Sequence, residues 1–225
     1  MSISVVDLNA VAGKLERPFA LTPLAKVGDL SLSAYLCQGQ MSWHKHLDED
    51  ELFLVHEGVV VLDTHRGKLS LHSEELAVVP KGVSHRSLSQ LRSVVLLLRP
   101  SVLTERKNGH RTHSVDTDPP LEKVRLARVL TTLSEPYQPT ALARVEDYEL
   151  LLVSAQDEGP AEVAPTFGAL WLVVRGRLRV TVNGDDAHTL ETGNLVVVPG
   201  GALYRLNGAP GTLALTLARA VGTGH

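Results

Sequence analysis

The sequence contains little of several residue types, and each shortage excludes a class of protein. A single cysteine, Cys37, stands in a chain of 225 residues, so no disulfide can form within the chain. Aromatic residues make up 4% of the chain, too few for the stacking surface of a single-strand nucleic-acid binder or the aromatic belt of a membrane protein. We expect Cys37 to be a small buried thiol.

An excess of charge of one sign is also lacking. Lysine and arginine number 22 against 25 acidic residues, which leaves a net charge of -3 and no general attraction to phosphate. No apolar run approaches the roughly 18 residues of a membrane span, and the N-terminus lacks the basic start of a secretion signal. The sequence therefore predicts a cytoplasmic protein with no nucleic-acid or membrane partner.

The chain does contain an internal repeat. The composition, 44% apolar and 21% charged, is that of an ordinary globular protein. Shifting the sequence by 118 positions aligns the two halves, and the offset becomes 119 after a hairpin turn near residue 65. The aligned pairs include Leu8 and Leu126, Gly58 and Gly176, and Pro80 and Pro199. This repeat predicts a first domain over residues 1–104, a linker over 105–120 and a second domain over 121–225.

Each half is expected to open with a short helix and to continue as strands. Leu8, Val11 and Leu15 share one helix face, as their counterparts do in the second half. Short apolar segments bounded by turn residues follow, as is typical of a β-sandwich or barrel. In the first half the predicted strands cover residues 19–27, 30–37, 51–56, 59–63, 68–72, 76–79 and 93–99.

A cluster of histidines and one glutamate carries the chemistry. Residues two apart in a strand face the same side, so His44 and His46 project together. An acidic loop leads to Glu51 at the start of the next strand, and a turn formed by Pro80 and Gly82 leads to His85. Three nitrogens and one oxygen suit one divalent ion of Fe, Mn, Ni, Zn or Cu.

At these spacings the sequence resembles the cupin superfamily, whose motifs read G-x5-H-x-H-x3,4-E-x6-G and G-x5-P-x-G-x2-H-x3-N. Gly39 lies one residue nearer to the histidines than the first motif asks, and Glu74 and Ser89 replace a glycine and the asparagine of the second. The resemblance implies an all-β fold with two tandem double-stranded β-helix (jelly-roll) barrels. It also implies that the metal ligands are His44, His46, Glu51 and His85.

The second half resembles the same scaffold without the ligand set. Glu162, Ala164, Ala169 and Tyr204 occupy the aligned positions of the four presumed ligands. We expect a degenerate cupin barrel without a metal site, retained for packing or for a different ligand.

The function remains open between two classes. In the first, the metal acts on a chelating enol or diol, as in a dioxygenase or a related enzyme such as an isomerase. In the second, the barrel binds a sugar or organic acid without catalysis, as a sensor does. A storage role fits least, because packing does not require an intact ligand set. A small molecule is the expected partner in either class, and the resemblance allows a homodimer.

No catalytic residue beyond the presumed ligands can be assigned from the sequence. The nearby candidates for a general acid or base are Asp48, Glu49 and Arg86. Period-two alternation places Phe53 and Val55 on the face of Glu51. These two residues are candidate pocket walls, with Trp43 or Met41 near the mouth.

Overall fold

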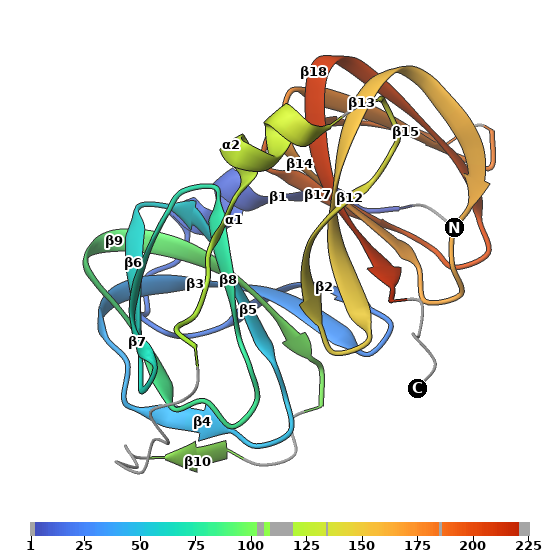
Figure 1. Ribbon diagram of the computed structural model, residues 1–225. Coiled ribbons are helices and arrows are strands. Elements are labelled where there is room, and N and C mark those ends of the chain that lie inside the picture. Colours follow the sequence, from blue (N-terminus) through green and yellow to red (C-terminus); the bar gives the residue numbers. More distant parts are fainter. Residues whose placement is uncertain (1–2, 103–105, 109–118, 134, 185, 221–225) are drawn as a thin grey trace. The chain divides into compact units, whose positions relative to one another are not determined.

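The computed structural model describes residues 3–102, 106–108, 119–133, 135–184 and 186–220, which form two curled sheets (Figure 1). The chain divides into two compact units, one made of Ala12–Arg128 and the other of Met1–Val11 with Val129–His225. The prediction of an all-β fold with two jelly-roll barrels and a short helix at the start of each repeat is confirmed. No helix within the described residues is long and apolar enough to cross a membrane.

The first unit is a sheet that, over the residues described, has ten strands. Its long strand β9 (His85–Pro100) pairs with β3, β4, β5 and β6 and so lies at the centre of the sheet. The other strands are β2 (Thr22–Val27), β3 (Leu30–Gln40), β4 (His44–His46), β5 (Glu51–Glu57), β6 (Val59–Thr64), β7 (Gly67–His72), β8 (Glu75–Val79), β10 (Arg106–Asn108) and β11 (Val124–Arg125).

The second unit repeats these strands at the offsets found in the sequence. The bounds of β5 and β6 recur 118 residues later, and those of β8 recur 119 residues later, which agrees with a duplication. Its strands are β1 (Val6–Asp7), β12 (Thr140–Val145), β13 (Tyr148–Val163), β14 (Ala169–Arg175), β15 (Arg177–Val182), β16 (Asp186–Glu191), β17 (Asn194–Val198) and β18 (Leu203–Arg219).

Each repeat opens with a very short helix, as predicted, although the first helix ends at Gly13 and so excludes Leu15 of the predicted face. The helix α1 (Leu8–Gly13) begins after Asp7, whose carboxylate Oδ1 accepts hydrogen bonds from the backbone N–H groups of Asn9 and Ala10 at 2.9 and 3.2 Å. An aspartate in this position satisfies backbone donors that the first helical turn leaves unpaired. The counterpart α2 (Leu126–Val129) continues into the 3₁₀ helix η1 (Leu130–Thr132).

The opening segment of each repeat pairs with a strand of the other repeat. In one unit Val6 of β1 pairs with Leu195 of β17, and in the other Val124 of β11 pairs with Leu76 of β8. The two compact units of the structure therefore begin and end at residues that differ from the predicted ranges 1–104 and 121–225. Strand β10 lies inside the predicted linker 105–120, of which residues 105 and 109–118 lie outside the described part.

Both faces of the central strands are covered. In β5 the residues from Glu51 to Val55 are all buried, so the strand contributes to the barrel interior on one face and to packing on the other. Cys37 is a fully buried thiol in the core of the first unit, as expected.

Two turns keep their geometry in both repeats although one residue type differs. Gly58 and Gly176 both have φ of 85°, a left-handed conformation that favours glycine. Glu74 has φ of 63° where Gly193 has 87° in the second repeat. Glu74 therefore replaces the glycine of the second motif without changing the left-handed conformation of the turn.

Candidate metal centre

Three strands of the first barrel bring the predicted residues together. His44 in β4 and His85 in β9 are cross-strand partners, and Glu51 begins β5. Donor atoms of these three side chains all lie within 4.8 Å of one another, and each residue is buried. The structure therefore brings together three of the four side chains that the spacing predicts.

Backbone carbonyls orient two of the imidazole rings. Nδ1 of His44 lies 2.9 Å from the carbonyl oxygen of Ser42, and Nδ1 of His85 lies 3.0 Å from that of Val83. Each Nδ1–H donates to its carbonyl, which leaves Nε2 as the nitrogen available inside the barrel. Metal-binding histidines in proteins are commonly fixed in this way.

The Nε2 atom of His85 lies 3.1 Å from Oε2 of Glu51. Because Nδ1–H already donates to a carbonyl, a neutral His85 presents a lone pair to the carboxylate, and two acceptors at this distance repel each other. A cation, either a proton on the imidazole or a metal ion, relieves this repulsion. The donor set therefore fits a divalent metal ion.

Glu51 is an ionised carboxylate surrounded by positive or polar groups. Burial opposes its ionisation, but a hydrogen bond from the protonated form of His85, the positive charges of the protonated His85 and His46 rings, and the charge of Arg99 outweigh burial and lower its pKa to about 2. The Arg99 guanidinium donates to Oε1 of Glu51 at 2.9 Å. This negative oxygen pair is available to a cation at neutral pH.

His46 lies beside the group of three but is not part of it. Its Nε2 is 3.4 Å from Oε1 of Glu51, and its buried Nδ1 makes no hydrogen bond, with Oε2 of Glu49 at 3.8 Å. Burial is the main cause that lowers the pKa of His46, so the ring is a neutral base at pH 7. His46 as a fourth ligand stays a prediction.

A cavity of about 110 Å³ adjoins the cluster within the first barrel. Phe53 and Met41 line it as predicted, whereas Val55 and Trp43 are not among its lining residues. The Tyr35 hydroxyl donates to Oγ of Ser87 at 3.2 Å. Burial raises the pKa of Tyr35, so this wall keeps a protonated phenol.

Sequence reasoning missed Arg99 and Tyr35 as parts of this cavity. The sequence did hold a signal for Arg99. In the predicted strand 93–99, residues two apart share a face, so Arg99 lies on the same face as Leu97, and both line the cavity. Tyr35 offered only the ordinary pattern of a core aromatic.

The three predicted acid–base candidates lie in different surroundings. The guanidinium of Arg86 pairs with Asp63 at 2.7 Å and lies over the ring of Trp43, so it is engaged outside the cluster. Asp48 is exposed, whereas Glu49 is buried beside His46.

Comparisons with known proteins show which families and folds the chain is similar to. A family model described as Homogentisate 1,2-dioxygenase N-terminal matches residues 17–94, about a third of the chain. The uncharacterized protein YdbB of Bacillus subtilis (strain 168) is 32% identical over 91 residues, which are 40% of this chain and 80% of that protein.

Two solved structures share the fold over nearly the whole chain. Salicylate 1,2-dioxygenase from Pseudaminobacter salicylatoxidans, also solved with gentisate, aligns with a TM-score of 0.76 at 13% identity over 96% of this chain and 84% of that one. A cupin 2 conserved barrel domain protein from Leptotrichia buccalis aligns with a TM-score of 0.71 at 9% identity over 98% of both chains.

Two jelly-roll barrels, the first with a buried group of two histidines and a glutamate, define a metal-binding bicupin. The chain belongs to the same family as YdbB, and its fold is that of the cupin proteins.

Proposed function

We propose that the first barrel is the active site of a metal-dependent oxidoreductase of the dioxygenase type. One divalent ion (Fe, Mn, Ni, Zn or Cu) is held by His44, His46, Glu51 and His85. The observation that carries the proposal is the buried contact between Nε2 of His85 and Oε2 of Glu51, which calls for a cation. The matches to a homogentisate dioxygenase family model and to salicylate 1,2-dioxygenase support the reaction class.

The substrate class follows from the cavity next to the cluster. A bound metal ion supplies Lewis-acid or dioxygen-activating chemistry to a substrate with two neighbouring oxygen atoms, such as an enol or a diol. The guanidinium of Arg99 lines the same cavity and favours an anionic substrate group. Phe53 and Leu97 contribute apolar walls that limit the access of water.

A non-catalytic ligand-binding role is the second candidate. One observation favours it: the cavity of about 110 Å³ is smaller than the about 300–1,000 Å³ typical of small-molecule sites. In this role the same cluster and Arg99 would hold a small organic acid or sugar.

Oxygen consumption separates the two candidates. Protein loaded in turn with each of the five metals is mixed with a panel of enols, catechols and hydroxylated aromatic acids. Oxygen uptake that depends on the metal and is lost in His85→Ala supports the oxidoreductase. Saturable binding of a panel compound without oxygen uptake, whichever metal is loaded, would contradict the oxidoreductase and support the non-catalytic binding role.

The sequence ranges 1–104 and 121–225 remain our proposal for the duplicated units. The first carries the metal cluster, and 105–120 joins the two. The two compact units of the structure differ from these ranges because the opening segment of each repeat pairs with a strand of the other repeat.

A further inference from the structure

The second barrel contains a larger cavity than the first. Its volume is about 440 Å³, against about 110 Å³ beside the metal cluster. Its lining residues all come from the second unit, between Tyr137 and Arg219. A volume of this size lies within the about 300–1,000 Å³ range of small-molecule sites.

This cavity occupies the strand positions that hold the metal cluster in the first barrel. His44 and His85 are cross-strand partners there, and Glu162 and Tyr204 are cross-strand partners here. Ala169 begins β14 where Glu51 begins β5. A methyl group in place of a carboxylate enlarges the interior.

Substitutions along the opposite strand add to the space. Val153 and Ala218 line this cavity at the positions where Tyr35 and Arg99 line the first. The barrel has thus lost the ion pair and the phenol that fill its counterpart. Within the described residues, the group of three metal donors lies in the first barrel.

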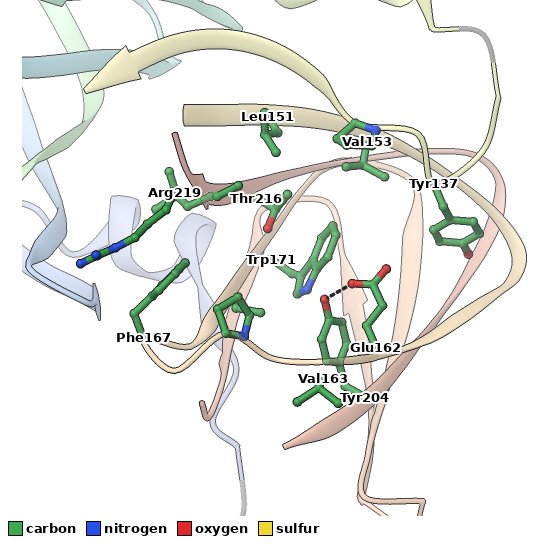
Figure 2. A pocket seen from close by; sticks show the side chains of 15 residues that line it. Tyr137, Leu151, Val153, Glu162, Val163, Phe167, Trp171, Tyr204, Thr216 and Arg219 are labelled. Atoms are coloured by element: carbon green, nitrogen blue, oxygen red, sulfur yellow. Dashed lines mark hydrogen bonds between the residues drawn. The ribbon is translucent and has the colours of Figure 1, made fainter. Parts of the chain in front are cut away.

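The walls of the cavity are mainly apolar and partly aromatic, as Figure 2 shows. Trp171 stands in the middle of the view, with Leu151 and Val153 on one side. Phe167 packs edge-on against Tyr148, with ring centroids 5.4 Å apart, and the guanidinium of Arg219 lies over both rings. These contacts hold one wall in place before any ligand arrives.

One end of the cavity is polar. The Tyr204 hydroxyl donates to Oε2 of Glu162 at 2.6 Å (Figure 2). Burial, together with the hydrogen bond and charge of Glu162, raises the pKa of Tyr204, so the phenol keeps its proton. This pair presents a carboxylate, an acceptor of hydrogen bonds, to the cavity.

The indole N–H of Trp171 is a buried donor without a well-formed hydrogen bond. Trp171 is 5% exposed, and its Nε1 atom has no partner at full hydrogen-bond geometry. Figure 2 shows it on the side of the Tyr204 hydroxyl, where its weak contact slightly offsets the raised pKa of that phenol. A buried donor without a good partner lowers stability, because it has lost its hydrogen bonds to water. A ligand oxygen next to the indole would remove that cost.

We propose that the second barrel is a metal-independent binding site for a small uncharged molecule that combines an apolar ring with a hydroxyl group. The ring packs against Trp171 and the aliphatic walls. The ligand hydroxyl accepts a hydrogen bond from the Trp171 N–H and donates one to the Glu162 carboxylate. A carboxylate ligand is disfavoured at this end because Glu162 is itself negative.

The indole resonance of Trp171 tests the proposal directly. The chain has two tryptophans, so ¹⁵N-labelled indoles give two signals, and Trp43→Phe identifies the one from Trp171. The full chain is titrated with 4-ethylphenol, ethylbenzene and 4-ethylbenzoate. We expect 4-ethylphenol to shift the Trp171 signal saturably, ethylbenzene to bind about tenfold more weakly, and 4-ethylbenzoate to cause no saturable shift.

Two variants locate the binding in the second barrel. Ala169→Leu fills the cavity and should weaken 4-ethylphenol binding at least tenfold, and its thermal midpoint shows whether it is folded. Glu162→Gln should weaken 4-ethylphenol binding without changing ethylbenzene binding, and it leaves the apolar walls intact. His85→Ala is the matched control in the first barrel and should leave 4-ethylphenol binding unchanged.

The outcomes separate this proposal from the function of the first barrel. Absence of a saturable Trp171 shift with 4-ethylphenol would overturn the proposal, as would unchanged binding in folded Ala169→Leu. Loss of binding in His85→Ala would overturn it too, because the ligand would then belong to the metal cluster. Metal content and oxygen uptake are measured separately and test only the first barrel.

Discussion

The two barrels share a scaffold and differ in what lies inside it. The strands β5 and β14 have matching bounds, and Gly58 and Gly176 make the same left-handed turn. Inside, two histidines and a glutamate converge in the first barrel, whereas a tyrosine–glutamate pair borders an open cavity in the second. Scaffold and site thus depend on different residues, because turns and apolar strands form the barrel and a few inward polar positions decide its chemistry.

Metal binding should show the largest difference between the barrels. We expect about one divalent ion per chain in the natural sequence and less than about a tenth of that in His85→Ala, because a missing ligand leaves Glu51 without its partner. Elemental analysis of dialysed protein measures this. Tyr204→Phe, at the matched position of the second barrel, should retain the full metal content.

Retention of stoichiometric metal by a folded His44→Ala, His46→Ala double variant would contradict the ligand assignment. Circular dichroism shows whether the double variant keeps its strands.

Core packing should be equally important in both barrels. Leu71 and Leu190 occupy matched positions and are both fully buried. Replacing either with alanine leaves a cavity, and we expect each change to lower the free energy of unfolding by about 3 kcal/mol. Urea unfolding measures both. A much smaller cost at Leu190 would mean that the second barrel is loosely packed, contrary to the structure.

The matched turn glycines provide a finer comparison. A Cβ atom on Gly58 would lie 2.3 Å from Oγ of Ser93, and one on Gly176 would lie 2.7 Å from Oγ1 of Thr212. Because both residues also have positive φ, we expect alanine to cost about 2 kcal/mol at each. Gly201→Ala is the control, since its φ is 78° but nothing lies within 4 Å, and it should cost about 1 kcal/mol. Equal costs at all three sites would contradict the steric argument.

The smallest effect concerns the charge that holds β11 against β8. Burial opposes ionisation of Glu75, but hydrogen bonds from Lys123 and the His72 backbone and the charges of Lys123 and Arg125 together lower its pKa. In the second barrel the neutral Asn194 accepts the equivalent backbone hydrogen bond from Glu191. We expect Glu75→Gln to cost about 1–2 kcal/mol at pH 7.

This cost should depend on pH in one direction. A carboxylate whose pKa is lowered by folding stabilises the protein above its unfolded pKa, and the stabilisation is lost as the pH falls through the folded pKa. The difference between the natural protein and Glu75→Gln should therefore shrink toward zero in acid. Glu57→Gln, at an exposed pair with Arg92, is the control and should cost less than about 0.5 kcal/mol at either pH. A difference that persists in acid would assign the effect to packing.

Much of the fold was predictable because its signals are local. Period-two alternation and turn residues located seven of the ten strands in the described part of the first unit, although β9 begins at His85 and not at residue 93. The pairing of β1 with β17 could not be predicted, because a two-residue strand has no pattern and its partner is almost two hundred positions away along the chain. The duplication itself suggested that each repeat keeps its own opening segment.

The amino-acid sequence by itself determined the duplication, the all-β class and the candidate metal cluster, since residue spacing in strands and turns dictates which side chains share a face. Only the tertiary structure decided that Arg99 contacts Glu51, that the opening strands pair across the repeats, and that the second barrel contains a large open cavity. The physical reason is that the volume of a cavity and long-range pairing depend on how distant strands meet. The small side chains of Ala169 and Val153 border the same cavity only once the barrel has folded and brought their strands together.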